Sequence, residues 1–241
     1  MTTETPHWLL IHSTGFPSSQ WKRITPLLPG TVIAPNLPGY PGTPWDPSKD
    51  VLDADSNAIL EVAARYPGSH LVGHSYGGLI AMHAARKRPD LFSQVSLIEP
   101  VVIGLVERPE DLDPVMVKAI GSFKGALEQT HLESALRAFF DFWGGSGAFD
   151  NMPPPIRNSI LAMAPKLGQE IQATGAESSK PSDWETLQPL RIIVSKNRKT
   201  FIDSIAHSLK GAVSGSRIIE VPGEHMCPVT HAKDVAAALL T

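Results

Sequence analysis

The sequence predicts an α/β fold in which a mostly parallel central sheet is flanked by helices. Short apolar runs alternate with helical patterns along most of the 241 residues, which is the order expected when helices connect parallel strands. A Gly-x-Ser-x-Gly run, Gly73–Gly77, stands between one such apolar run and one helical pattern. Residues 101–183 break the alternation because they contain helical patterns and no convincing strand.

Strands are predicted where apolar residues follow one another without interruption, because a strand covered on both faces has no polar side. The stretch Asn36–Asp50 is rich in Pro and Gly and is predicted to be a loop. The predicted strands are His7–His12, Thr31–Pro35, His70–Gly73, Phe92–Ile98, Leu190–Val194 and Arg217–Val221.

Helices are predicted where apolar residues recur with the helical period. The first long one, Asp53–Tyr66, ends directly before the helix-breaking pair Pro67 and Gly68. The helices predicted beside the sheet are a short one near Ser19, and Asp53–Tyr66, Gly77–Lys87, Lys199–Lys210 and Thr230–Leu240.

Residues 101–183 are interpreted as a helical cap inserted between two strands of the sheet. Their helical patterns are Pro114–Ser122, His131–Trp143 and Pro154–Met163. The predicted domains are therefore a core made of residues 1–100 and 184–241, and a cap made of residues 101–183.

The composition argues against several classes of protein. The net charge is −3 and no cluster of Lys and Arg is present, which argues against a general nucleic-acid binder. A single cysteine, Cys227, excludes an intrachain disulfide. No apolar run approaches the ~20 residues of a membrane span. The first residues, Met1–Pro6, do not have the pattern of a signal peptide, so we expect a cytoplasmic protein.

The Gly-x-Ser-x-Gly run predicts a sharp turn from a strand into a helix, with Ser75 at its tip. Glycines on both sides leave room for strained backbone and expose the hydroxyl at the top of the sheet. A serine hydroxyl is a weak nucleophile at neutral pH and needs a base within hydrogen-bond reach. His225 is the predicted base because it follows the last strand, at the same carboxyl edge of the sheet as Ser75.

Taken together, these features resemble the α/β-hydrolase superfamily. The resemblance rests on the first strand ending at His12, the turn at Ser75, the helical segment after Glu99, and the late Gly-x-His at Gly223–His225. It covers nearly the whole chain and implies a catalytic triad in the order nucleophile, acid, histidine.

The acid of this triad is predicted to be Glu99, with Asp203 as the alternative. Many members of the superfamily place an aspartate shortly after the strand that corresponds to Leu190–Val194, but Ser195–Thr200 contains no carboxylate. Asp203 is the nearest carboxylate and is expected one turn into a helix. Glu99 ends a strand at the carboxyl edge, where some members of this fold carry their acid.

The resemblance also implies an oxyanion hole made of two backbone N–H groups. By position these belong to Thr14, in the loop after the first strand, and to Tyr76, directly after the nucleophile. Ser13 stands where the family's His-Gly-x motif has glycine, so the shape of this loop and a donor role for the Ser13 hydroxyl are left open.

The implied activity is that of a serine hydrolase that cleaves a carboxylic ester, lactone or thioester through an acyl-enzyme. A small-molecule substrate is expected, with no cofactor and no metal, since His225, Cys227 and His231 lack a fourth zinc ligand at a sensible spacing. Two alternatives stay open. A cofactor-independent lyase or carbon–carbon bond hydrolase would use the same three residues, and a non-catalytic binding module would hold a small ligand without turnover. The substrate is expected to depend on residues 101–183.

Overall fold

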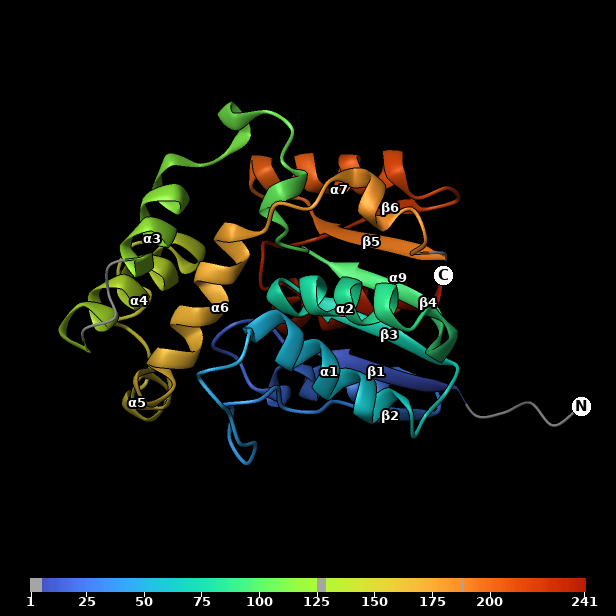
Figure 1. Cartoon of the computed structure of the whole chain (residues 1–241), viewed down its shortest axis with the longest axis horizontal. Coiled ribbons are helices and arrows are strands. Elements are labelled where there is room, and N and C mark those ends of the chain that lie inside the picture. The colour runs from blue at the N-terminus through green and yellow to red at the C-terminus, as the bar shows by residue number, and fades with distance from the viewer. Residues whose placement is uncertain (1–5, 125–128, 188) are drawn as a thin grey trace, which may run out of the picture.

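The computed structural model describes residues 6–124, 129–187 and 189–241. Within these ranges six strands form one sheet in the order β2-β1-β3-β4-β5-β6, and every neighbouring pair is parallel (Figure 1). The predicted fold class, a mostly parallel sheet flanked by helices, is confirmed. The strands are β1 His7–Ile11, β2 Thr31–Ile33, β3 Ser69–His74, β4 Phe92–Ile98, β5 Leu190–Ser195 and β6 Arg217–Val221.

The helices follow the strands in alternation on the sheet side of the molecule. The predicted helix Thr230–Leu240 corresponds to α9, which begins at Ala232, and Thr230 is the last residue of the short α8. The α-helices are α1 Val51–Ala63, α2 Tyr76–Lys87, α3 Pro114–Lys124, α4 Gln129–Gly144, α5 Pro154–Ala162, α6 Ala164–Ala176, α7 Thr200–Ala212, α8 Cys227–Thr230 and α9 Ala232–Leu240. The 3₁₀ helices are η1 Ser18–Arg23, η2 Thr25–Leu27, η3 Pro89–Leu91, η4 Ile103–Leu105, η5 Pro109–Asp111 and η6 Pro181–Trp184.

Both faces of the sheet are covered, which explains the uninterrupted apolar runs of its inner strands. Every residue of β3 and β5 is buried, whereas β2 and β6 at the two edges are partly exposed. Neighbouring residues of a strand point to opposite faces. Leu71 therefore packs in the cluster that includes side chains of α1, α2 and α7, while Val72 packs with Trp21 of η1 and Val235 of α9.

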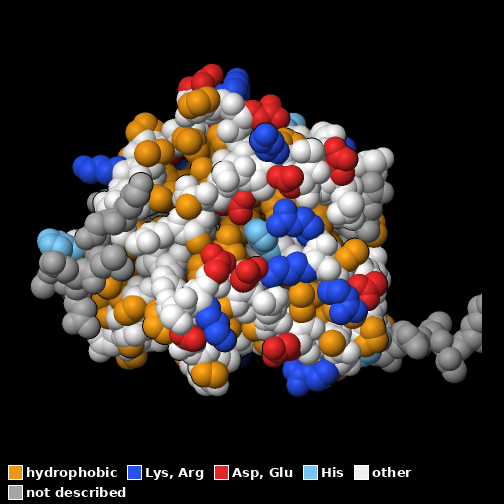
Figure 2. All heavy atoms as spheres, viewed as in Figure 1, with side chains coloured by type: hydrophobic (Ala, Val, Ile, Leu, Met, Phe, Trp, Pro, Cys, Tyr) orange, Lys and Arg blue, Asp and Glu red, His pale blue; other side chains and the backbone are white. Residues whose placement is uncertain are grey.

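The surface carries charges of both signs. On the face seen in Figure 2, acidic and basic side chains lie interspersed over the sheet part of the molecule, in keeping with the small net charge of −3. Across the described residues, we find no helix whose length and apolar character would let it cross a membrane. A cytoplasmic location stays a prediction.

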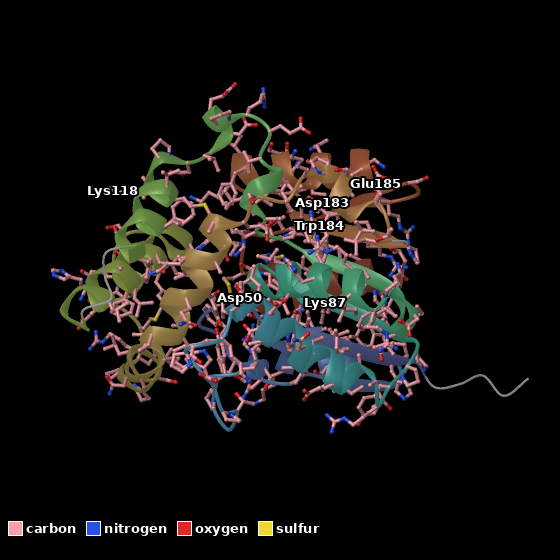
Figure 3. The ribbon with its side chains drawn as sticks, viewed as in Figure 1. Asp50, Lys87, Lys118, Asp183, Trp184 and Glu185 are labelled. Carbon is pink, nitrogen blue, oxygen red and sulfur yellow. The ribbon has the colours of Figure 1, made fainter. Side chains whose placement is uncertain are left out.

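The segment between β4 and β5 contains helices α3 to α6 and, among its described residues, no strand. It lies beside the edge at which the strands end (Figure 1). The chain returns to the sheet through η6, whose Trp184 is fully buried against α2 (Figure 3). The guanidinium of Arg86 lies 4.7 Å from the centre of the Trp184 ring, and the imidazole of His83 lies 5.4 Å from it. The division into a core and an inserted cap domain stays a prediction.

Helix α6 has no counterpart among the helices predicted from sequence. Gly168 and Gly175 lower its intrinsic helix propensity, so tertiary packing must stabilise it. Gly175 serves that packing directly, because a Cβ added there would run into Ile120 of α3. The sequence therefore misses a helix that buries Lys166, Glu170 and Ile171 in the interior.

The packing of the turn at Ser75 predicts the effect of one methyl group. In Gly77→Ala, the new Cβ would run into the backbone carbonyl oxygens of Ile11 and His12, which cannot move without disturbing β1. We expect a loss of about 1–3 kcal/mol in the free energy of unfolding, measured by urea denaturation. Gly211→Ala is the matched control, since Gly211 lies in α7 with open space around its Cα and should gain about 0.5–1 kcal/mol. Equal stability of the two variants would contradict this account.

Candidate active site

Ser75 occupies the turn between β3 and α2 with a strained backbone. Its φ is 56° and its ψ is −121°, a combination that residues other than glycine rarely adopt. The turn is held from two directions. The N–H of Ser75 donates to the carbonyl of Ile98 on β4 at 3.0 Å, and Gly77 lies against the backbone of β1. This conformation directs the Ser75 hydroxyl away from the sheet, as the Gly-x-Ser-x-Gly run predicts.

His225 lies in the loop after β6, directly beside Ser75. Its Nε2 atom is 3.0 Å from the Oγ of Ser75. A neutral imidazole that carries its proton on Nδ1 can accept the serine proton at Nε2. The imidazole of His74 donates from Nε2 to the carbonyl oxygen of His225 at 2.8 Å, which fixes the backbone of this loop. Burial lowers the pKa of His74 well below its usual value, so this ring stays neutral.

Glu99 completes the chain of contacts from the other side of the imidazole. Its Oε2 atom is 3.3 Å from Nδ1 of His225, and its Oε1 accepts a 2.6 Å hydrogen bond from the N–H of Ser195. The side chain is fully buried, and its backbone has a φ of 47°. Both carboxylate oxygens are therefore engaged, one by the imidazole and one by β5.

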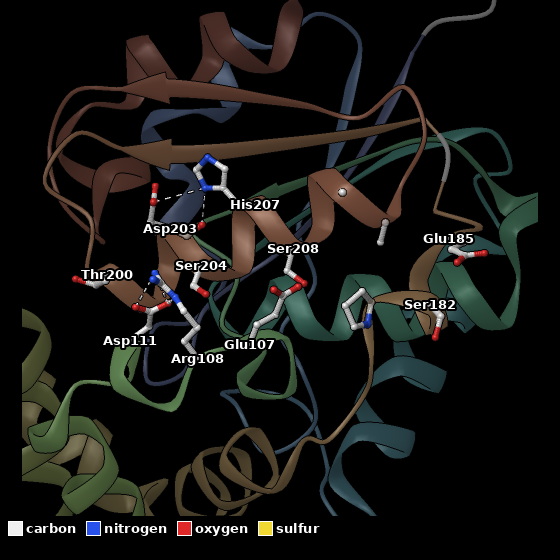
Figure 4. A pocket seen from close by; sticks show the side chains of 13 residues that line it. Glu107, Arg108, Asp111, Ser182, Glu185, Thr200, Asp203, Ser204, His207 and Ser208 are labelled. Atoms are coloured by element: carbon white, nitrogen blue, oxygen red, sulfur yellow. Dashed lines mark hydrogen bonds and ion pairs between the residues drawn. The ribbon is translucent and has the colours of Figure 1, made fainter.

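Asp203 lies elsewhere. It is in the first turn of α7, as expected, and its carboxylate accepts a 2.6 Å hydrogen bond from Arg198 and lies 3.5 Å from Nδ1 of His207. The groove that it lines is open to solvent, has a volume of about 440 Å³ and includes neither Ser75 nor His225 (Figure 4). The geometry thus brings Glu99, not Asp203, to the imidazole.

The two predicted oxyanion residues flank Ser75. Tyr76 is the first residue of α2, so its N–H has no acceptor within the helix. Thr14 lies in the loop after β1 and lines both cavities that reach Ser75. The Ser13 hydroxyl, in contrast, donates to Oε1 of Gln20 at 2.7 Å. It is therefore engaged away from the position of a reacting carbonyl.

Two small apolar cavities meet at Ser75. The larger has a volume of about 90 Å³ and the smaller about 20 Å³. Thr14, Phe139 and Trp143 line both of them, and no Asp, Glu, Lys or Arg is among the described residues of either wall. The ring of Trp143, from α4, stacks on the imidazole of His225 with 3.6 Å between centres and 17° between planes. The cavities can thus accept uncharged groups on either side of the serine.

The described residues contain no group of three or more His, Cys, Asp or Glu side chains that could hold a metal ion. Of the three residues His225, Cys227 and His231, His225 has its ring nitrogens facing Ser75 and Glu99, and His231 bonds to Thr230. Burial raises the pKa of the Cys227 thiol, which keeps it protonated.

Comparison with known proteins identifies the family of this chain. A family model described as the alpha/beta hydrolase family matches residues 8–238. The chain belongs to this family. In solved structures, the alpha/beta hydrolase fold is seen, for example, in a 2-hydroxy-6-oxo-6-phenylhexa-2,4-dienoate hydrolase from Rhodococcus sp. strain RHA1. That structure matches with a TM-score of 0.74 at 17% identity and covers 98% of this chain and 90% of its own.

Two curated relatives share parts of the sequence. Lipase LipV of Mycobacterium tuberculosis is 31% identical over 125 residues, which are 46% of this chain and 48% of the lipase. A pimeloyl-[acyl-carrier protein] methyl ester esterase of Aromatoleum aromaticum is 36% identical over 109 residues, 44% of this chain and 41% of the esterase. The chain thus matches about half the length of these relatives or less.

The site predicts different effects for the two candidate acids. Glu99→Gln removes the charge beside His225 Nδ1, whereas Asp203→Asn acts in a separate groove. We expect Glu99→Gln to slow the reaction of Ser75 with a fluorophosphonate by roughly 10²–10⁴-fold, because the base loses its orienting partner. Asp203→Asn should react at the unaltered rate. Intact mass against time measures both, and the reverse result would assign the acid to Asp203.

Proposed function

We propose that this alpha/beta hydrolase is a serine hydrolase that cleaves small, uncharged carboxylic esters, or equally activated lactones and thioesters, through an acyl-enzyme. The observation that carries the proposal is the continuous contact from Ser75 Oγ to His225 Nε2 at 3.0 Å and from His225 Nδ1 to Glu99 at 3.3 Å. A nucleophile, a base and an orienting acid in that order are what acyl transfer requires.

The first half of the reaction transfers the acyl group to the enzyme. The Oγ of Ser75 attacks the carbonyl carbon while Nε2 of His225 takes its proton. Glu99 holds the other imidazole nitrogen and stabilises the imidazolium that forms. The N–H groups of Thr14 and Tyr76 bind the oxyanion, each worth about 3–4 kcal/mol in the transition state. His225 then protonates the leaving alcohol as the tetrahedral intermediate collapses.

The second half releases the acid and restores the enzyme. Water enters where the alcohol left and gives a proton to His225 as its oxygen attacks the acyl carbon. The second tetrahedral intermediate collapses, the Ser75 oxygen takes the proton back from His225, and the carboxylic acid leaves. Trp143 covers one face of the imidazole throughout, which restricts its rotation and the access of bulk water.

The cavity walls favour a short, apolar substrate. No charged side chain among the described lining residues could pair with a substrate charge, so an ionised acyl chain would be desolvated without a partner. The cavity of about 20 Å³ is close to the size that holds one water molecule, at roughly 10–15 Å³. It suits the attacking water or a methoxy group, and the larger cavity then takes the short acyl chain. The partial likeness to a lipase and to a methyl ester esterase supports ester chemistry.

The proposal predicts the outcome of two assays that need no natural substrate. A fluorophosphonate should add once, at Ser75, and the adduct should be absent in Ser75→Ala. In a panel of methyl and p-nitrophenyl esters, turnover should be highest for short, neutral acyl groups and should fall by roughly 10³-fold or more in Ser75→Ala and His225→Ala.

Two other outcomes of these assays would favour the alternative functions. An adduct at Ser75 without turnover of any ester, lactone or thioester would favour the lyase or carbon–carbon bond hydrolase. No adduct on folded protein, with the cavity still able to bind neutral small molecules, would favour the binding module.

A further inference from the structure

Three ionisable side chains form a cluster in the interior between the sheet part and the cap segment. Asp55 comes from α1, and Lys166 and Glu170 come from α6; all three side chains are at most 1% exposed. The ammonium of Lys166 donates to both carboxylate oxygens of Asp55, at 2.8 and 2.6 Å, and lies 3.5 Å from Oε1 of Glu170. Neither charged end touches the two cavities at Ser75.

Each end of the cluster holds one side of the predicted oxyanion hole. At the Asp55 end, the hydroxyl of Tyr76 donates to Oδ2 of Asp55 at 2.8 Å. At the Glu170 end, the hydroxyl of Tyr40 donates to Oε2 of Glu170 at 3.1 Å and accepts the N–H of Gly15 at 2.9 Å. Gly15 directly follows Thr14 in the loop.

We propose that the buried Asp55–Lys166–Glu170 cluster positions the oxyanion hole by fixing the separation between the backbone N–H groups of Thr14 and Tyr76. The inference rests on the proposed function, in which these two groups bind the oxyanion. Asp55, Lys166 and Glu170 are positioning residues, because they act through Tyr40 and Tyr76 and do not touch the reacting atoms.

The small contribution of buried ion pairs to stability suggests that this cluster serves a positioning role. Buried ion pairs add little to stability compared with apolar side chains of similar volume, because the desolvation of each charge offsets the attraction. Oxyanion donors, in contrast, must be held within about 0.5 Å of the productive geometry. A cluster with directional hydrogen bonds at both ends meets that requirement.

The protonation of Glu170 decides whether its end of the cluster carries a negative charge. Burial raises the pKa of Glu170 to about 7, against the opposing effect of Lys166. The groups that face the cluster are Asp55 from α1, Tyr76 from α2, and Tyr40 and His12 from the loops beside β1. Burial keeps the two tyrosines protonated and lowers the pKa of His12 to about 4, so all three stay neutral near pH 7. The ionised carboxylate accepts from Tyr40 at Oε2 and attracts the Lys166 ammonium, 3.5 Å from Oε1, whereas protonation removes this charge and weakens both contacts.

Tyr40→Phe and Glu170→Gln test the proposal with the full chain and the best ester of the panel. Removing the hydroxyl or the charge should lower kcat by at least about ten-fold while KM changes by less than about two-fold, because the oxyanion exists only in the transition state. The affinity for a trifluoromethyl ketone with the same acyl chain should fall by the same factor as kcat/KM, since its hemiketal on Ser75 carries an oxyanion. Tyr40→Phe keeps the buried ring, so it decides the matter alone if Glu170→Gln does not fold.

Tyr66→Phe is the matched control. It removes the same hydroxyl from a tyrosine that lies just before β3, at the far edge of the sheet from Ser75, and should leave all three quantities unaltered. The positioning role is wrong if Tyr40→Phe and Tyr66→Phe have the same kcat, KM and ketone affinity. It is also wrong if Tyr40→Phe raises KM while kcat and the ketone affinity stay at the native values. An inactive native protein that forms no Ser75 adduct would instead overturn the proposed function, and this inference with it.

The pH dependence separates positioning from a purely structural role. Because protonation of Glu170 already weakens the cluster in the native protein, the ratio of native kcat to Glu170→Gln kcat should rise with pH through about 7. Protonation of the histidine base affects both proteins alike and cancels in this ratio. The same rise is expected for Tyr40→Phe. The kcat ratios are measured from about pH 5.5 to about pH 8.5 in steps of about half a pH unit. Ratios that stay constant over this range would contradict the proposal.

Discussion

The strained backbone at Ser75 is the constraint on which the rest of the site depends. A residue with φ of 56° stays in that conformation only when its surroundings leave no alternative. Here β1 lies against Gly77 with no space for a Cβ, and β4 accepts the Ser75 N–H. The turn therefore exists because three neighbouring strands hold it. It sets the direction of the hydroxyl and leaves the first N–H of α2 free to bind an oxyanion.

Parallel strands bring the remaining groups to the same place. Ser75 follows β3, Glu99 follows β4 and His225 follows β6, and the carboxyl ends of all three strands lie at one edge. Glu99 repeats the pattern of strain, with a φ of 47° at the end of its strand. The two strained residues other than glycine among the described ones thus stand at either end of the Ser75–His225–Glu99 contact, where the sheet's stability can maintain them.

The helices between β4 and β5 contribute to this edge in two physically different ways. Helix α4 supplies the aromatic rings that exclude water and cover His225. Helix α6 supplies buried charges that connect, through Tyr40 and Tyr76, to the loops around the serine. Helix α6 thereby connects the segment between β4 and β5 to the residues on both sides of Ser75.

Sequence patterns were enough to predict the fold class, the positions of most strands and Ser75 as the candidate nucleophile. Those features depend on local patterns. Apolar runs indicate strands that are buried on both faces, and the glycines around Ser75 indicate a turn in which larger side chains would not fit. Only the tertiary structure decided that Glu99 and not Asp203 faces His225, because both follow strands and only their three-dimensional placement separates them. It also revealed α6 with Lys166 and Glu170. Its glycines interrupt the helical pattern. The role of its buried charges becomes visible only beside their partners, which for Lys166 and Asp55 lie 111 residues apart in the sequence.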